Sequence, residues 1–342
     1  MTTTAHAVLE RLVRREDLSA DDTYALFRTI VRGEVETPLL AGILVALRSK
    51  GETVHELSGA ASALRDSAVP IARTASPVAD TCGTGGDGAR TLNVSTAAAL
   101  VCAAAGLPVA KHGNRAVSSS AGSADVLEAL GAEIDVSPEV AGRALAESGF
   151  CFLFAPRMQP GIAHAMPARR ALQLRTIFNL LGPLVNPARP EVQLLGVADP
   201  RHVMPMAHVL RELGCRAALV VHGDGHDEIA LHGTTVAAHL HEGDVEALEL
   251  TPALADVTPH ERGALVGGDA AFNAHALAAL LSGRGRPAFV EATVLNAGAL
   301  LWIAGRADDL RAGVKRARAA LDQGDAALVL DGYKEVTRAS RP

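Results

Sequence analysis

A glycine-rich stretch between an expected strand and an expected helix constrains this chain most. The apolar segment at residues 77–79 is typical of the end of a short buried strand, and the sequence DTCGTGGD follows it at residues 80–87. An Ala-rich helix is expected over residues 97–105, ending at Gly106. Glycines allow sharp turns and close approach to a ligand, and the free N–H groups at a helix start favour an anion. The stretch therefore predicts an α/β unit with a loop for phosphate.

Polar side chains precede this expected helix. Ser95 or Thr96 can cap it, but their hydroxyls, together with the amide of Asn93, could equally donate to phosphate oxygens. The loop ends in no Walker Gly-Lys-Ser/Thr and lacks the spaced dinucleotide fingerprint. These residues alone leave the two interpretations open.

A second polar loop follows the next expected strand, at residues 108–110. It begins with KHGNR at residues 111–115 and continues with small polar residues at 118–125. Ligands of open α/β sheets collect at the carboxyl ends of strands, so we expect both loops to face one crevice. Lys111 would supply the positive charge for a phosphate there.

Composition and charge exclude several classes of protein. The 342 residues are 49% hydrophobic and 20% charged, which suits a soluble α/β protein, and the net charge of -6 argues against a nucleic-acid partner. No apolar run approaches the ~20 residues of a membrane span, and mixed charges between residues 10 and 17 are unlike a signal peptide. We expect a cytoplasmic protein without a membrane partner. The four cysteines are widely spaced, which predicts neither a zinc site nor a disulfide framework.

The periodicity of apolar residues changes once along the chain. Residues 1 to about 72 show only helical spacing, whereas short apolar strands alternate with helices from about residue 73. The predicted fold is α/β: a small all-helical domain plus a larger α/β domain with a mainly parallel central sheet covered by helices. Further strands are expected at 150–154, 194–198, 217–222, 229–231, 236–240 and 248–250, the last three as an antiparallel flank, and further helices at 124–130, 167–181, 201–213, 270–281, 292–304 and 309–321.

Six motifs together resemble those of the anthranilate phosphoribosyltransferase family, the tryptophan-pathway members of the group that includes the pyrimidine nucleoside phosphorylases. They occur in family order over nearly the whole chain: GTGGD at 83–87, NVST at 93–96, KHGNR at 111–115, RTIFNLLGPL at 175–184 with Asn186-Pro187, GDG at 223–225 with Asp227-Glu228, and LNA at 295–297. The resemblance implies a discontinuous organisation. The small helical domain would consist of residues 1–72 plus about 167–190 and would carry the contact of a homodimer. The α/β domain, which binds phosphoribosyl pyrophosphate, would consist of residues 73–166 plus 191–342.

The resemblance also implies an activity and its residues. The family transfers the phosphoribosyl group of phosphoribosyl pyrophosphate to the amine of anthranilate, releasing pyrophosphate with Mg²⁺. Carried over to this chain, Mg²⁺ would be bound by Ser95, Asp227 and Glu228. Without the resemblance, the two acids would be interpreted as a solvated turn. The donor would be held by Gly83, Gly85, Gly86, Asp87, Thr91, Asn93, Ser95, Thr96, Lys111 and Ser119.

The acceptor side departs from the family pattern. Arg169 matches the arginine that pairs with the anthranilate carboxylate, a role suited to a planar guanidinium. Gln159 stands where the family has a histidine, small Gly161 and Ala163 could widen the acceptor channel, and Ser120-Ala121 lacks the usual lysine. For His112, a structural histidine bonded to backbone is an equally good interpretation. The acceptor residues implied are Gly83, His112, Asn114, Gln159, Arg169 and Pro183.

Three other functions are compatible with parts of this pattern. A family member that uses another aromatic acid would explain Gln159. A pyrimidine nucleoside phosphorylase shares the loops, but leaves Arg169 and the Asp227-Glu228 pair without an evident role. A non-catalytic nucleic-acid-binding homologue is disfavoured by the acidic net charge.

Overall fold

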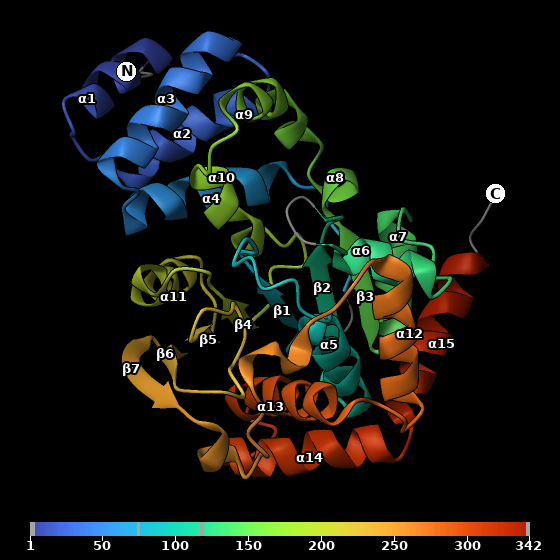
Figure 1. Ribbon diagram of the computed structural model, residues 1–342. Helices are drawn as coiled ribbons and strands as arrows, with labels where there is room; N and C mark the ends of the chain where they lie inside the picture. The colour runs from blue at the N-terminus through green and yellow to red at the C-terminus, as the bar shows by residue number, and fades with distance from the viewer. Residues whose placement is uncertain (1–3, 74–75, 117–119, 340–342) are drawn as a thin grey trace.

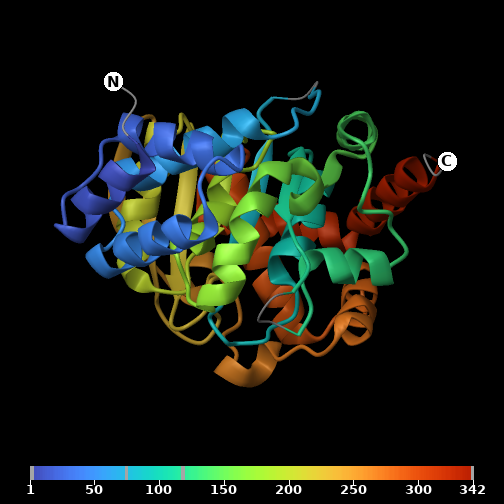
Figure 2. The same ribbon diagram turned by 90° about the horizontal axis from the view of Figure 1, so that it is seen from above.

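The computed structural model describes residues 4–73, 76–116 and 120–339 of the chain. A bundle of helices carries the N-terminus and stands beside a larger α/β part that ends in α15 (Figure 1). The two termini lie at opposite ends of the molecule (Figure 2). No helix among the described residues is long and apolar enough to cross a membrane.

The bundle begins with four helices whose ends are set by local signals. The Ser19 side chain accepts a hydrogen bond from Asp22 N–H, Thr53 and Glu56 form a capping box, and α3 ends at Gly51. The helices are α1 (Ala5–Val13), α2 (Ala20–Val31), α3 (Thr37–Lys50) and α4 (Val54–Ser67).

A seven-stranded sheet forms the centre of the α/β part, in the order β3-β2-β1-β4-β5-β6-β7. The first five strands in this order are parallel, and β6 and β7 are antiparallel, as expected for the flank. The chain builds β2 and β3 on one side of β1 and then crosses to β4 on the other side. This reversal places a switch point at the carboxyl ends of β1 and β4. The strands are β1 (Ala79–Gly83), β2 (Val109–Gly113), β3 (Phe150–Phe154), β4 (Val192–Gly196), β5 (Ala217–Gly223), β6 (Thr235–His241) and β7 (Asp244–Leu250).

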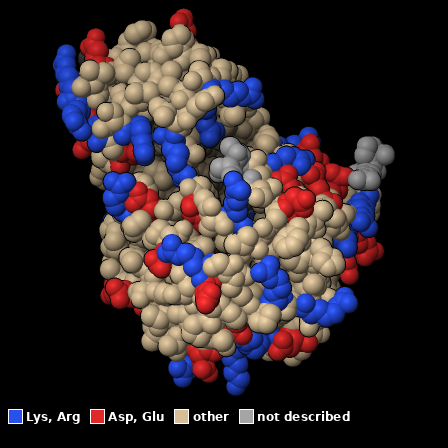
Figure 3. All heavy atoms as spheres, in the orientation of Figure 1, with Lys and Arg blue, Asp and Glu red and all other residues tan. Residues whose placement is uncertain are grey.

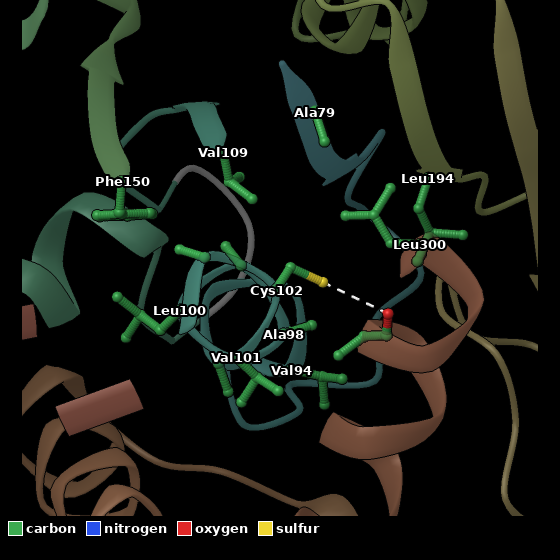
Figure 4. Close-up of a cluster of buried hydrophobic side chains, with 14 of the residues drawn as sticks. Ala79, Val94, Ala98, Leu100, Val101, Cys102, Val109, Phe150, Leu194 and Leu300 are labelled. Carbon is green, nitrogen blue, oxygen red and sulfur yellow. Dashed lines mark hydrogen bonds between the residues drawn. The ribbon is translucent and has the colours of Figure 1, made fainter. Parts of the chain in front are cut away.

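Helices cover both faces of the sheet because side chains alternate between the faces. Leu194 belongs to one buried cluster and Leu195 to another. The first face packs against α5 (Val94–Ala104), where Cys102 Sγ lies 3.4 Å from the carbonyl oxygen of Ala297 (Figure 4). The second packs against α11 (Val203–Glu212) and the bundle. The remaining helices of the α/β part are α6 (Ser123–Ala129), α7 (Pro138–Ser148), α12 (Ala270–Leu281), α13 (Pro287–Ile303), α14 (Leu310–Asp322) and α15 (Asp325–Arg338).

After β3 the chain returns to the bundle. This crossover segment contains α8 (Ala155–Met158), α9 (Met166–Leu172) and α10 (Ile177–Leu181) with the 3-10 turns η1 (Pro160–Ala165) and η2 (Gly182–Leu184). Phe178 packs with its ring centroid 5.7 Å from that of Phe27 on α2. The prediction of one helix over 167–181 was wrong, because Gln173 adopts φ 50 and ends α9.

Other sequence expectations also need correction. The strand β1 continues to Gly83 instead of ending at residue 79, and α5 begins at Val94 with Asn93 as its N-cap residue. Ser95 and Thr96 therefore lie in the first turn and do not cap it. The segment 229–231 is buried but is no strand, and α7 and α15 were not predicted.

Candidate functional site

Four parallel strands end in glycine at one edge of the sheet: β1 in Gly83, β2 in Gly113, β4 in Gly196 and β5 in Gly223. The loops that follow them meet at the switch point. Lys and Arg side chains also gather where the bundle adjoins the α/β part (Figure 3). A site at this edge can therefore draw on several segments that are distant in sequence.

The glycine loop after β1 contacts the acidic segment after β5. Gly85 N–H donates to Asp227 Oδ2 at 2.8 Å, and Asp227 N–H donates to Asp87 Oδ2 at 3.4 Å. A Cβ on Gly83 would lie 2.3 Å from Asp227 Oδ2, and one on Gly196 would lie 1.6 Å from the carbonyl oxygen of Asp227. Only glycine allows this approach at both strand ends.

The acidic pair carries a strong electrostatic perturbation. Burial, reinforced by the Asp87 carboxylate, raises the pKa of Asp227 to about 6. Burial and then the charge of Asp227 raise the pKa of Glu228 to about 8, against the opposing charge of Lys111. Simultaneous ionisation of Asp87, Asp227 and Glu228 is therefore unfavourable. A bound cation would reduce the repulsion among the three carboxylates.

Lys111 supplies a buried positive charge beneath the glycine loop. Its side chain is 2% exposed, because β2 lies between β3 and β1 inside the sheet. Its Nζ donates to the carbonyl oxygen of Thr81 and, at 3.1 Å, to Ser95 Oγ on α5. The lysine thus links β1, β2 and the start of α5.

Asn93 is oriented by a residue that is distant in sequence. Its Oδ1 accepts a hydrogen bond of 2.9 Å from Nδ2 of Asn273 on α12, and Asn273 Oδ1 in turn accepts from Gly268 N–H at 2.8 Å. The Asn93 Nδ2 lies 3.4 Å from the carbonyl oxygen of Ala121. Beside it, Thr91 bridges to Val266.

Two of the expected site residues have a buried polar atom that lacks a hydrogen-bond partner among the described residues. One is Thr96 Oγ1 in the first turn of α5, and the other is His112 Nε2 at the end of β2. The opposite ring nitrogen of the histidine, Nδ1, lies 3.2 Å from the carbonyl oxygen of Gly182, which assigns the proton to Nδ1. Burial lowers the pKa of His112 to about 4, so the ring is neutral and Nε2 carries a free lone pair.

A buried carboxylate supports the same strand ends. Asp80 Oδ1 accepts from His112 N–H at 3.3 Å, and its Oδ2 accepts from Asn186 Nδ2 at 2.9 Å. The same amide also donates to the carbonyl oxygen of Ala110 at 2.7 Å. Asp80 and Asn186 thereby hold β1 and β2 to the crossover segment.

Arg169 lies on α9 without an ion pair to any residue that the structure describes. Its guanidinium stands over the ring of Phe178, 5.2 Å from the centroid, and its Nη1 lies 3.7 Å from Met166 Sδ. Burial lowers the pKa of the guanidinium. A partly buried arginine without a carboxylate partner suits an acidic ligand.

The other expected acceptor residues are held by backbone contacts. Gln159 is 2% exposed, and its Nε2 donates to the carbonyl oxygen of Val185 at 2.8 Å. Asn114 is exposed and accepts from Arg115 N–H at 2.8 Å. Pro183 is buried.

The small size of Gly161 is required by packing in the bundle. A Cβ on Gly161 would lie 2.9 Å from the Cβ of Val31 on α2. Gly161 also lines a cavity of about 400 Å³ together with Arg28 and His164.

Contacts between the described residues join one part of the expected site. Hydrogen bonds, close approaches or mutual charge effects connect seven of its residues: Gly83, Gly85, Asp87, Ser95, Lys111, Asp227 and Glu228. Ser119 lies outside the described residues. Among the described residues, no group of three or more His, Cys, Asp or Glu side chains is arranged to hold a metal ion by itself.

Sequence reasoning missed three contributors to this edge. Arg175 and Asn186 stood inside a recognised motif, but their contacts were not anticipated. Asn273 carried no signal at all, because nothing in an Ala-rich helix marks one asparagine as a partner of Asn93.

Comparison with known proteins gives the family. The family model described as "Glycosyl transferase family, a/b domain" matches residues 75–327. The model described as "Glycosyl transferase family, helical bundle domain" matches residues 6–68. An anthranilate phosphoribosyltransferase of Sorangium cellulosum is 56% identical over 97% of this chain and 96% of its own length. This chain belongs to the anthranilate phosphoribosyltransferase family.

Other members of the family agree in sequence and fold. The relative from Pseudoalteromonas translucida is 46% identical over 96% of this chain and 93% of its own. The crystal structure of the Thermus thermophilus enzyme has a TM-score of 0.93 and 42% identity, covering 97% of this chain and 99% of that one. The Saccharomyces cerevisiae enzyme, in complex with PRPP and Mg, shares the fold with a TM-score of 0.89 at 24% identity, covering 98% of both chains. The expected fold class and family are thus confirmed.

Proposed function

We propose that this protein transfers the phosphoribosyl group of phosphoribosyl pyrophosphate to the amine of anthranilate, giving N-(5-phosphoribosyl)anthranilate and pyrophosphate in tryptophan biosynthesis. The observation that carries the proposal is the meeting of a glycine loop, a buried lysine and two adjacent acids at one sheet edge. The identity of 56% with a named anthranilate phosphoribosyltransferase supports anthranilate as the acceptor.

On the donor side, backbone amides and hydroxyls bind the pyrophosphate while Lys111 offsets its charge. The unpartnered hydroxyl of Thr96 in the first turn of α5 supports this assignment. The residues proposed to bind the donor are Gly83, Gly85, Gly86, Asp87, Thr91, Asn93, Ser95, Thr96, Lys111 and Ser119.

Mg²⁺ fits the acidic side of this edge. The raised pKa values of Asp227 and Glu228 mean that a cation would favour their ionised forms. Mg²⁺ takes oxygen ligands, usually one or two carboxylates with waters and substrate phosphates, which agrees with the lack of a larger ligand cluster among the described residues. Asp227, Glu228 and the Ser95 hydroxyl would hold it, and bound Mg²⁺ would neutralise charge on the leaving pyrophosphate.

On the acceptor side, Arg169 pairs with the anthranilate carboxylate. Neutral His112 offers the Nε2 lone pair to an N–H of the acceptor amine, because its Nδ1 proton is bonded to Gly182. Gly83, Asn114, Gln159 and Pro183 complete the proposed pocket. The amine attacks the sugar carbon directly as the bond from that carbon to pyrophosphate breaks, and the nitrogen loses one proton to the leaving pyrophosphate. Positioning and electrostatic stabilisation therefore supply the rate without a covalent nucleophile.

The loss of anthranilate fluorescence tests the proposal. Consumption should require the protein, phosphoribosyl pyrophosphate and Mg²⁺ together. A folded protein that binds the donor but leaves anthranilate unchanged would refute it, and turnover of another aromatic acid would identify a changed acceptor. Phosphorolysis of a pyrimidine nucleoside without turnover of anthranilate would instead identify a phosphorylase.

We also propose the domain division and assembly that the family resemblance implies. Residues 1–72 plus about 167–190 form the helical domain, and 73–166 plus 191–342 form the α/β domain. Packing of α9 and α10 on the bundle supports this division. Exposed Val13 on α1 and Val45 on α3 suit a homodimer contact, which light scattering of Val45→Glu would test by giving monomers. The expected location is the cytoplasm, which fractionation of cells would test.

A further inference from the structure

Arg175 reaches from the crossover segment onto the glycine loop. Its Nη1 donates to the carbonyl oxygens of Gly85 and Gly86 at 3.2 and 3.3 Å, and its Nη2 donates to that of Gly85 at 3.1 Å. Both glycines have positive φ, 63 and 78. A guanidinium forms such a fork because its donors lie in one rigid plane.

This fork determines where two N–H groups point. In a trans peptide the C=O and N–H point in opposite directions. The Gly85 carbonyl shares its peptide unit with Gly86 N–H, and the Gly86 carbonyl shares its unit with Asp87 N–H. Since Arg175 holds both carbonyls, both N–H groups face away from it. Neither donates to a residue that the structure describes. Successive N–H groups of this kind form an anion-binding concavity.

We propose that Arg175 is a positioning residue for the donor: it holds the glycine loop so that Gly86 N–H and Asp87 N–H face the pyrophosphate. This inference rests on the proposed function. Arg175 lies between the end of α9 and the start of α10. No ion pair with a described residue holds the guanidinium elsewhere.

Arg175→Ala tests the proposal, with Arg170→Ala as the control. Arg170 is an exposed arginine on α9 that makes no contact of this kind with a described residue. Arg175→Ala should raise KM for phosphoribosyl pyrophosphate about tenfold or more, because hydrogen bonds from a charged group are lost. KM for anthranilate at saturating donor should stay within about twofold. Millimolar guanidinium should partly restore donor KM, and methylammonium should not.

A direct binding measurement separates this proposal from the proposed reaction. Calorimetry with pyrophosphate and Mg²⁺ should show weaker binding to Arg175→Ala than to the wild type, even if anthranilate is not the acceptor. Unchanged pyrophosphate affinity, or equal rises in both KM values, would overturn the positioning role. If the alanine variant fails to fold, Arg175→Gln is measured instead and must show the same donor defect.

Two glycine substitutions provide an independent check. A Cβ on Gly86 would lie 1.7 Å from Arg175 Nη1, whereas one on Gly88 meets nothing within 4 Å, although both residues have nearly equal φ, 78 and 77. Gly86→Ala should reproduce the donor defect of Arg175→Ala and remain insensitive to guanidinium. Gly88→Ala bears the same backbone strain and should affect donor KM much less. Equal effects of the two substitutions would contradict the proposal.

Discussion

Replacing His112 by asparagine should remove one component of the pH dependence of stability. The ring is 6% exposed, and burial lowers its pKa from 6.5 to about 4. Between these values the unfolded chain binds the proton more strongly, so His112 destabilises the fold as pH falls from 6.5 to 4. At pH 5 this difference in proton binding lowers the free energy of unfolding by about 2 kcal/mol relative to pH 8. Asparagine carries no proton charge and can still place an N–H on the carbonyl of Gly182.

The assay is urea unfolding of wild type and His112→Asn at pH 5 and pH 8. The difference in unfolding free energy between the two pH values should be about 2 kcal/mol smaller in the variant. His275→Asn is the control, because His275 is exposed on α12 and makes no hydrogen bond or ion pair with a described residue. An unchanged pH difference in His112→Asn would refute the reasoning.

Three further variants test the proposed site. Arg169→Ala should raise KM for anthranilate about tenfold or more and hardly affect donor binding, because a charged hydrogen-bond pair is removed; steady-state kinetics with equal losses for both substrates would contradict the assignment. Asp227→Asn with Glu228→Gln should raise the Mg²⁺ concentration needed for activity, and an unchanged titration would exclude both from the metal site. Asn273→Ala frees the Asn93 amide and should raise donor KM several-fold without changing KM for anthranilate; a reversed pattern would argue against donor positioning.

Local signals account for what could be predicted from the sequence. A strand, a glycine loop and an Ala-rich helix in succession indicate an α/β unit, since each element depends on neighbours within a few residues. The cap at Ser19 and the stop at Gly51 are equally local. The parallel sheet with its antiparallel flank followed from the alternation of strands, helices and turns.

Local patterns failed where a side chain outside the segment satisfies the backbone. The apolar segment 229–231 was expected to be a strand, but Ile229 N–H donates to Asn296 Oδ1 and Ala230 N–H to Thr235 Oγ1. These side chains take the place of a strand partner. The break between α9 and α10 also lacks a local signal, because the residue that adopts the left-handed conformation there is Gln173 and not a glycine. Both helices pack against the bundle.

The sequence by itself determined the chemistry available to this protein: glycines for a phosphate loop, one lysine, a pair of acids and an unusual glutamine in the acceptor segment. Only the tertiary structure decided which of these groups meet. Gly85 and Asp227 are 142 residues apart, and Arg175 is 90 residues from Gly85. Such contacts arise because the strand order brings the ends of β1 and β5 to one edge, an arrangement set by packing of the whole sheet and not by any local pattern.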